Sequence, residues 1–228
     1  MPMRILLGED DHDMLDITSY ALRKHGFEVV GVSDGTAVLE RWRAEQPDVI
    51  VLDVNMPGVS GMDVCRQIRS ESSIPIVMLT ALHDEAHVVE GFECGADDYV
   101  SKPVSYRALA MRLRTILQRR TPDSVLQTSS VVESGDLRVD LEGHDVRKAS
   151  MPVRLTRLEV RILHFLVANA GRVLQTHRLV ELAWNYEGGD AFALKTHISH
   201  IRQKLGLIKG QAGYIRSLPH VGYTLEAA

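Results

Sequence analysis

Short apolar runs alternate with amphipathic segments through the first half of the chain. The runs occupy residues 5–7, 28–32, 49–52, 76–79 and 99–100. Apolar residues at helical spacing lie between them, as in the segment that carries Met14 and Leu22 and stops at Gly26. The last such segment begins after Ser105, a residue type that caps helices. Five strands that alternate with five helices predict an α/β domain built as a (βα)5 doubly wound parallel sheet.

The pattern changes in the second half of the chain. Apolar residues recur at every second position in parts of residues 131–155, which predicts a small antiparallel sheet. Thr156 and Glu159 have the spacing of a capping box and open a helix. Further helices are predicted over residues 176–184 and 191–205, and a hairpin over residues 214–216 and 223–225. Together these elements predict an α+β winged helix-turn-helix domain.

A polar segment separates the two patterns. Residues 119–130 contain Arg-Arg-Thr-Pro-Asp and Gln-Thr-Ser-Ser, which is a linker composition. A chain of 228 residues is long enough for two domains that each bury a core. We therefore predict an α/β domain at residues 1–120, a linker at 121–130 and a winged-helix domain at 131–228.

The two halves differ in charge, although the formal net charge of the chain is only −4. Residues 1–120 contain 13 Lys and Arg against 19 Asp and Glu, a balance of −6. Residues 156–225 contain 9 against 4, a balance of +5. A basic domain after an acidic one indicates that the second half binds a polyanion.

The sequence favours a cytoplasmic protein that has no membrane partner. No apolar run approaches the roughly 18–20 residues of a membrane span. The first strand begins near Arg4, which leaves no room for a signal peptide. Cys65 and Cys94 are the only cysteines and form no CxxC, so we expect free thiols.

Five chemically reactive side chains follow the ends of the predicted parallel strands. Glu9 and Asp10 follow the first strand, and Asp53 ends the third. The carboxyl ends of such strands meet at the topological switch point of the sheet, where ligands bind. Three converging carboxylates repel one another unless a cation is present, and Mg²⁺ suits such oxygen ligands. Thr80 adds a hydroxyl and Lys102 a positive charge, a set that predicts phosphoryl transfer onto Asp53.

These residues lie in segments that resemble the receiver domains of two-component response regulators. The resemblance covers residues 4–119. Its matching segments are Glu9-Asp10-Asp11, Asp53-Val54-Asn55-Met56-Pro57-Gly58 with Gly61, Thr80-Ala81, Gly95-Ala96-Asp97-Asp98-Tyr99 and Lys102-Pro103.

The resemblance to receivers implies a role for each of these residues. Asp53 would accept the phosphoryl group, which Thr80 and Lys102 would bind. Tyr99 would be an aromatic switch that turns inward, and the Lys102–Pro103 peptide would be cis. The cofactor would be Mg²⁺, held by Glu9, Asp10, Asp53 and the backbone carbonyl of Asn55.

The third helix of the second half has one apolar and one polar face. The apolar stripe is formed by Leu194, Ile198, Ile201 and Leu205. The opposite face carries Lys195, Thr196, Ser199, His200, Arg202 and Gln203. Within a basic domain, after a helix and turn and before a hairpin, such a helix is typical of major-groove recognition.

Residues 131–226 resemble the winged-helix domain of OmpR/PhoB-type regulators. The matching segments are Leu155-Thr156-x-x-Glu159, Gly171-Arg172-Val173-Leu174, Ala183-Trp184, His197-Ile198-x-x-Ile201-Arg202-x-Lys204-Leu205, Gly213-Tyr214-Ile215-Arg216 and Val221-Gly222-Tyr223. Three segments depart from the family: Phe192-Ala193-Leu194-Lys195 at the helix start, Ser199-His200 in place of an Arg-Arg pair, and Pro219-His220 in the wing.

The resemblance implies a set of DNA contacts for this domain. The set comprises Trp184, Lys195, Thr196, His197, Ser199, His200, Arg202, Lys204, Arg216, His220 and Tyr223. A protonated His200 would add a phosphate contact and strengthen binding between about pH 7.5 and pH 6. The alternative is a neutral His200 that faces solvent or its own helix.

The same family implies a dimer interface on the fourth helix, fifth strand and fifth helix. Two of its three intersubunit ion pairs are retained, Glu93 with Arg114 and Asp98 with Arg112. The third is replaced by Val88 and Ala108, and Val104 replaces the usual Phe after Lys-Pro. The interface is therefore expected to be weaker or more apolar than in relatives.

The resemblance as a whole implies a transcription regulator rather than an enzyme. Its partners would be a sensor histidine kinase, double-stranded promoter DNA, RNA polymerase and, on phosphorylation, a second copy of the chain. Two alternatives remain. A phosphoaspartyl phosphatase would need a second acid two residues after Asp53, where Asn55 stands. A regulator that works without phosphorylation would differ in its response to acetyl phosphate with Mg²⁺.

Overall fold

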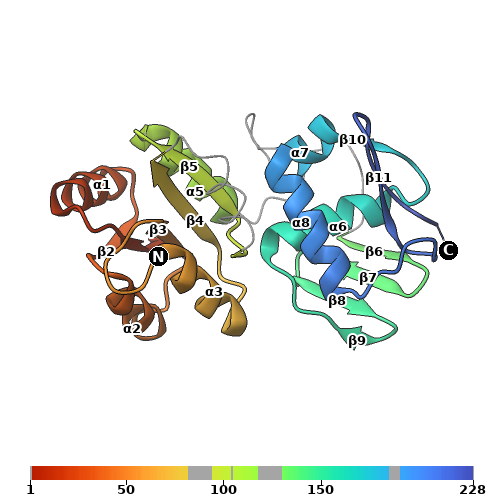
Figure 1. The fold of residues 1–228 in the computed structure, drawn as a ribbon, viewed down its shortest axis with the longest axis horizontal. Helices are drawn as coiled ribbons and strands as arrows, with labels where there is room; N and C mark the ends of the chain where they lie inside the picture. The colour runs from red at the N-terminus through yellow and green to blue at the C-terminus, as the bar shows by residue number, and fades with distance from the viewer. Residues whose placement is uncertain (1, 82–93, 104, 118–129, 185–190, 228) are drawn as a thin grey trace. The chain divides into compact units, whose positions relative to one another are not determined.

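The computed structural model describes residues 2–81, 94–103, 105–117, 130–184 and 191–227 (Figure 1). The chain divides into two compact units, Met1–Leu117 and Gln118–Ala228. The predicted linker lies outside the described residues except for Ser130, and so does most of the segment predicted as the fourth helix of the α/β domain. Within the described ranges, no helix is both long and apolar enough to cross a membrane.

The first unit is a five-stranded parallel sheet with helices on both faces. Its strands run in the order β2-β1-β3-β4-β5, and every pair is parallel. The elements are β1 (Arg4–Gly8), α1 (His12–Lys24), β2 (Glu28–Val32), α2 (Gly35–Glu45), β3 (Val49–Asp53), α3 (Gly61–Glu71), β4 (Ile76–Ala81), β5 (Asp98–Lys102) and α5 (Tyr106–Leu117). The doubly wound fold predicted from the apolar runs is confirmed.

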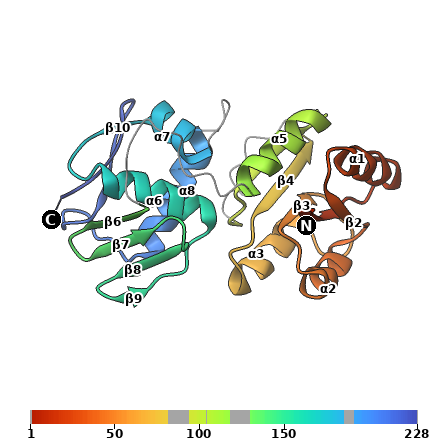
Figure 2. The same ribbon diagram turned by 180° about the vertical axis from the view of Figure 1, so that it is seen from behind.

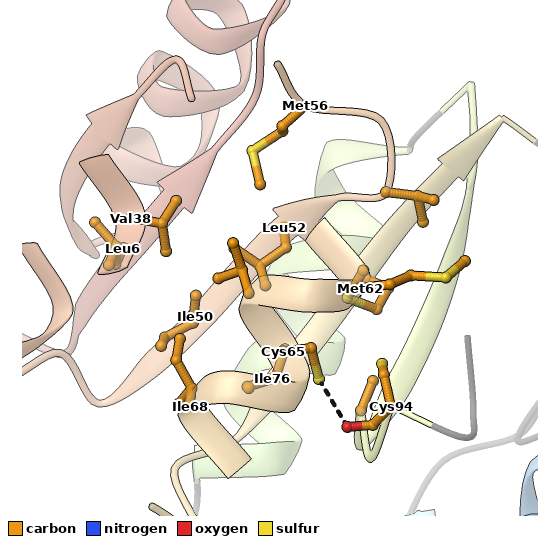
Figure 3. Close-up of a cluster of buried hydrophobic side chains, with 14 residues drawn as sticks. Leu6, Val38, Ile50, Leu52, Met56, Met62, Cys65, Ile68, Ile76 and Cys94 are labelled. Carbon is orange, nitrogen blue, oxygen red and sulfur yellow. Dashed lines mark hydrogen bonds between the residues drawn. The ribbon is translucent and has the colours of Figure 1, made fainter. Parts of the chain in front are cut away.

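Alternating residues of the strands build two cores, one on each face of the sheet. Leu6, Ile50 and Leu52 point to the face covered by α2 and α3, where Val38 and Ile68 meet them (Figure 3). The opposite core is covered by α1 and α5 and includes Ile5, Leu7, Val51, Leu22 and Leu109. Figures 1 and 2 show these two helix layers on either side of the sheet. The strands are therefore buried on both faces, which explains their continuous apolar runs.

The loop after β3 requires a glycine at its far end. A Cβ atom on Gly61 would lie 1.9 Å from the carbonyl oxygen of Asp53. The Gly61 amide instead donates to the carbonyl of Val54 at 3.0 Å, and Ser60 caps α3 through the amide of Asp63. Since only glycine permits this approach, the start of α3 packs directly against the carboxyl end of β3.

The described residues of the second unit form two antiparallel sheets and three helices. A four-stranded sheet in the order β6-β7-β8-β9 begins it, and a three-stranded sheet in the order β10-β12-β11 ends it. The elements are β6 (Val131–Ser134), β7 (Leu137–Asp140), β8 (Asp145–Lys148), β9 (Met151–Pro152), α6 (Arg157–Ala168), β10 (Leu174–Gln175), α7 (Thr176–Trp184), α8 (Ala191–Lys204), β11 (Ile215–Leu218) and β12 (Gly222–Leu225). The predicted α+β architecture is confirmed.

Local signals place the helices of this unit. Thr156 accepts from the amide of Glu159, whose side chain accepts from the amide of Thr156, so the predicted capping box is present. The α8 stripe of Leu194, Ile198 and Ile201 is buried as predicted. These contacts fix α8 against the rest of the unit and leave its other face outside the core.

Candidate functional site

Three carboxylates meet at the carboxyl end of the parallel sheet. Glu9 and Asp10 directly follow β1, and Asp53 is the last residue of the neighbouring strand β3. One oxygen of each lies within 4.8 Å of the others. Glu9 and Asp53 are 1% and 6% exposed, whereas Asp10 is exposed to solvent. The predicted convergence of these side chains is therefore present in the structure.

Lys102 supplies the positive charge of this pocket. Its Nζ lies 2.6 Å from Oδ2 of Asp53 and 2.8 and 2.7 Å from Oε1 and Oε2 of Glu9. Lys102 ends β5, and its peptide bond to Pro103 is cis, as the resemblance implied. In the ladder between β4 and β5, Thr80 pairs with Ser101. The strand ends thus bring a lysine, a hydroxyl residue and three carboxylates to one edge of the sheet.

Glu9 and the half-buried Lys102 shift each other's pKa. Burial raises the pKa of Glu9, and the nearby Asp53 raises it further, while Lys102 opposes both effects. For Lys102, burial acts to lower the pKa, but hydrogen bonds to Asp53 and Glu9 outweigh it, so the pKa is raised. Lys102 is therefore fully charged at neutral pH and partly neutralises the carboxylates.

The donor set of the pocket fits a hard divalent cation. All three groups are carboxylates, and the buried Oε2 of Glu9 has the Nζ of Lys102 at 2.7 Å as its counter-charge. The amide of Asn55 donates to Oδ1 of Asp53 at 3.1 Å, which fixes the loop beside that carboxylate. Mg²⁺ prefers oxygen ligands, and carboxylates are common among them. The acidic cluster is therefore consistent with a metal site.

Tyr99 lies on β5, and its ring packs against the core on the α2 and α3 face. Its hydroxyl lies 3.5 Å from Sγ of Cys94. Burial raises the pKa of Tyr99, so the phenol is neutral at physiological pH. Cys65, on α3, donates from Sγ to the carbonyl of Cys94 at 3.3 Å (Figure 3). The aromatic residue expected to switch therefore lies inward and half-buried in this structure.

The residues expected at a dimer interface make contacts within one chain. Arg112 on α5 lies 3.1 Å from Oδ2 of Asp98, which is buried at the start of β5. Arg114 donates to the backbone carbonyl of His25 and lies over the ring of Phe27. Ala108 is exposed. Glu93, Val88 and Val104 lie outside the described residues.

Three residues of the expected set of DNA contacts are buried. Trp184 and His197 are buried and pack edge to face, with ring centroids 5.9 Å apart. Tyr223 is also buried, on the central strand β12, where burial raises its pKa. These side chains belong to the core of the unit, and their expected role as DNA contacts stays a prediction.

Four further residues of α8 make hydrogen bonds or ion pairs with groups of the unit itself. Arg202 donates to the carbonyl of Ile215 and to Ser217. The hydroxyl of Thr196 donates to the carbonyl of Phe192. His200 and Lys204 both face the carboxylate of Glu159 on α6. A helical projection places His200 and Arg202 on the outer face but does not reveal acceptors on the neighbouring elements.

A small group of polar residues is exposed on α8 and in the terminal hairpin. Lys195, Ser199 and Gln203 are exposed at successive turns of α8, although Gln203 was not among the expected contacts. Arg216 on β11 and His220 in the hairpin are also exposed, and Arg216 lies 3.6 Å from Glu226. This exposed polar row would have been found by counting four residues at a time from Lys195.

Comparison with known proteins covers both units. Residues 5–114 match the family described as "Response regulator receiver domain", and residues 150–225 match "Transcriptional regulatory protein, C terminal". The chain is 39% identical to the transcriptional regulatory protein CseB of Streptomyces coelicolor, over 98% of this chain and 97% of that protein. It is 37% identical to the sensory transduction protein RegX3 of Mycobacterium tuberculosis, over 97% and 98%.

A solved structure matches the whole chain as well. The chain is similar to the response regulator DrrB of Thermotoga maritima, described as an OmpR/PhoB homolog, with 30% identity, a TM-score of 0.53 and full coverage of both chains. Both families are thus matched in one chain, which covers 97%, 98% and 100% of the length of these three relatives. The chain belongs to the OmpR/PhoB-type response regulators of two-component systems, with a receiver domain followed by a DNA-binding transcriptional regulatory domain.

Proposed function

We propose that Asp53 accepts a phosphoryl group from a sensor histidine kinase and that this modification drives dimerisation and DNA binding. The observation that carries the proposal is the contact of Lys102 with Asp53, at 2.6 Å, beside Glu9 and Asp10. A carboxylate nucleophile needs a cationic surrounding, because the arriving phosphoryl group is itself negative.

In the proposed transfer, an Asp53 oxygen attacks the phosphorus atom of a phosphohistidine or a small phosphodonor. The new P–O bond forms as the bond to the leaving group breaks and the leaving group keeps the electron pair. A histidine leaving group takes up a proton from solvent, whereas a carboxylate leaving group departs as the anion. Lys102 stabilises the negative charge on the phosphoryl oxygens, and the Thr80 hydroxyl donates to one of them. Mg²⁺, held by Glu9, Asp10, Asp53 and the Asn55 carbonyl, would neutralise further negative charge when bound.

A dimer interface on α5 and β5 is the proposed route to DNA binding. Asp98 and Arg112 pair within one chain at 3.1 Å, so an intersubunit pair would require an exchange of partners with little net gain. Ala108 is exposed on α5, and Met111 on the same helix is 60% exposed. These apolar side chains support an interface that relies more on apolar contact than on ion pairs.

The DNA-reading face is proposed to be the exposed row of α8 together with the hairpin. Lys195, Ser199 and Gln203 would enter the major groove, and Arg216 and His220 would lie near the phosphates. Because Lys195 and Arg216 are the Lys and Arg residues among these five, each subunit would neutralise few phosphates. Dimerisation would therefore supply much of the affinity.

The proposal is tested by phosphorylation of the full chain with acetyl phosphate. Wild-type protein with Mg²⁺ is expected to form an acid-stable, hydroxylamine-labile adduct, and chelation of Mg²⁺ is expected to prevent it. Asp53→Asn keeps the shape of the side chain but removes the attacking carboxylate, so no adduct is expected. Asp16→Asn, at an exposed position of α1, is the matched control and should label normally. Equal labelling of Asp53→Asn and wild type would overturn the assignment.

A further inference from the structure

A second group of metal-ligating side chains lies in the winged-helix unit, away from the receiver pocket. Glu159 on α6 and His197 and His200 on α8 each offer one ligand atom, and these atoms lie within 4.8 Å of one another. The two histidines are three residues apart on α8 and so share one face of that helix. Two helices remote in sequence therefore bring a carboxylate and two imidazoles together.

The carboxylate of Glu159 is buried, so its negative charge requires a positive partner. Glu159 is 1% exposed, and its Oε2 accepts from the amide of Thr156 at 2.7 Å. Nζ of Lys204 lies 2.8 and 2.7 Å from the two Glu159 oxygens. A buried carboxylate without a positive partner is strongly unfavourable. In the structure Lys204 satisfies this requirement, and its side chain is 37% exposed, so the ammonium group can turn to solvent.

The geometry of the histidines suits a shared ion. Nδ1 of His200 lies 3.8 Å from Oε1 of Glu159, and the His197 and His200 rings are nearly perpendicular with centroids 6.3 Å apart. Ligand atoms of a tetrahedral zinc ion with bonds of about 2.1 Å are about 3.4 Å apart, so small side-chain rotations close the site. His197 is buried and held edge to face by Trp184, which limits its motion.

The chemistry of the donor set differs from that of the receiver pocket. The receiver pocket offers only carboxylate oxygens, which suit Mg²⁺. Two imidazoles with one carboxylate are instead a donor set for zinc and similar first-row transition ions, with a fourth position left for water. The two sites should therefore select different metals.

We propose that Glu159, His197 and His200 bind one divalent transition ion of the zinc type, which replaces the ammonium group of Lys204 as the counter-charge of Glu159. The imidazoles bind in their neutral form, and Lys204 stays protonated as it moves into solvent. The ion would join α6 to α8, the helix that exposes Lys195 and Ser199. The proposal concerns a site separate from Asp53 and does not depend on phosphorylation.

The site is tested by titrating the full chain with Co²⁺ in the presence of excess Mg²⁺, which occupies the oxygen site of the receiver. We expect one equivalent to give the visible d–d absorption of four-coordinate Co²⁺, without a thiolate charge-transfer band, and Zn²⁺ to displace it. His200→Gln should weaken binding by at least about 100-fold, since even outer-shell changes weaken metal sites by 10–100-fold. His177→Gln, at an exposed histidine of α7, is the matched control and should bind like wild type.

A second variant moves the affinity in the opposite direction. Lys204→Gln removes the competing ammonium group and should tighten Co²⁺ binding by about tenfold, because the ion then meets an uncompensated carboxylate. Zn²⁺ should raise the thermal unfolding temperature of this variant more than that of wild type. Three results would overturn the proposal: absence of the four-coordinate spectrum in wild type, retained binding in His200→Gln, or loss of the signal in Asp10→Ala, which alters only the receiver pocket.

Discussion

Lys102 is the residue through which the charges of the receiver pocket are balanced. Its ammonium group contacts both buried carboxylates, at 2.6 Å from Asp53 and 2.7 Å from Glu9. Asp10, in contrast, is exposed, so its negative charge lies on the solvent side of the pocket. The pocket thus holds more negative than positive charge. This excess favours binding of a further cation and raises the free energy of the charged form of Glu9.

The raised pKa of Glu9 predicts a pH-dependent penalty on folding. Between the ordinary value of 4.5 and the higher value in the folded protein, the folded state binds more protons than the unfolded state. Stability from this group is therefore full below pH 4.5 and is lost as the pH rises through that interval. Without Mg²⁺, Glu9→Gln should unfold at a higher temperature than wild type at pH 7, and the difference should shrink toward pH 4.5.

Thermal unfolding across this pH range, with chelator present, measures the effect. Glu28→Gln, at an exposed carboxylate on β2, is the control and should not reproduce the pH-dependent gain. A Glu9→Gln protein that is less stable than wild type at pH 7 would show that the Lys102 contact outweighs the burial of Glu9.

Single side chains were the least predictable part of the molecule. The receiver residues Glu9, Asp53 and Lys102 could be placed from the sequence because a parallel sheet brings its strand ends together. The orientation of His200 could not, because it depends on Glu159, which is buried 41 residues earlier in the chain. Periodicity along α8 contains no information about such an acceptor on another helix.

At the scale of elements, α5 presents an apolar surface where the expected ion pairs are incomplete. Met111 is 60% exposed on this helix, so its replacement should leave stability within about 0.5 kcal/mol. Met111→Glu would place a charge in each half of the proposed interface, and we expect it to weaken the phosphorylated dimer at least tenfold. Sedimentation of the phosphorylated protein measures this change.

The control for this change is another exposed methionine. Met151→Glu, at a residue that is 69% exposed on β9 of the other unit, should dimerise like wild type. An undiminished dimer of Met111→Glu would place the interface on a different surface.

The exposed row of α8 predicts a small electrostatic contribution to DNA binding. Lys195 is the cation of this row, so Lys195→Gln should weaken binding to duplex DNA and reduce the slope of log affinity against log salt by about 0.9 per subunit. Fluorescence anisotropy at several salt concentrations gives this slope. Lys24→Gln, on α1 of the receiver, is the control and should leave this slope unchanged. If both variants reduce the slope equally, DNA binding is not centred on α8.

Elements were predictable where their signals are local. The capping box of Thr156 and Glu159 marks the start of α6, and the helix expected over residues 176–184 is α7 with the same bounds. The two-residue strand β10 was missed, because it exists only through pairing with β12 some 50 residues later. A Cβ atom on Gly222 would lie 1.9 Å from the carbonyl of Leu174, a close approach that no local pattern reports.

At the scale of the whole molecule, the two units carry opposite charge and separate chemistry. The receiver unit holds the acidic pocket, and the winged-helix unit holds the exposed row of α8. In the proposed function, phosphorylation adds negative charge at Asp53, which Lys102 and Thr80 would bind, and this change would bias the receiver toward a dimerising state. The proposed function therefore depends on one covalent event at Asp53.

The most direct test identifies the residue that carries the phosphoryl group. Wild-type protein treated with acetyl phosphate and Mg²⁺ is reduced with borohydride, which converts phosphoaspartate to homoserine, and the peptides are sequenced by mass spectrometry. Homoserine is expected at position 53, and it should be absent when Mg²⁺ is chelated. Homoserine at another aspartate, or a phosphorylated protein with Asp53 unchanged, would contradict the proposed function.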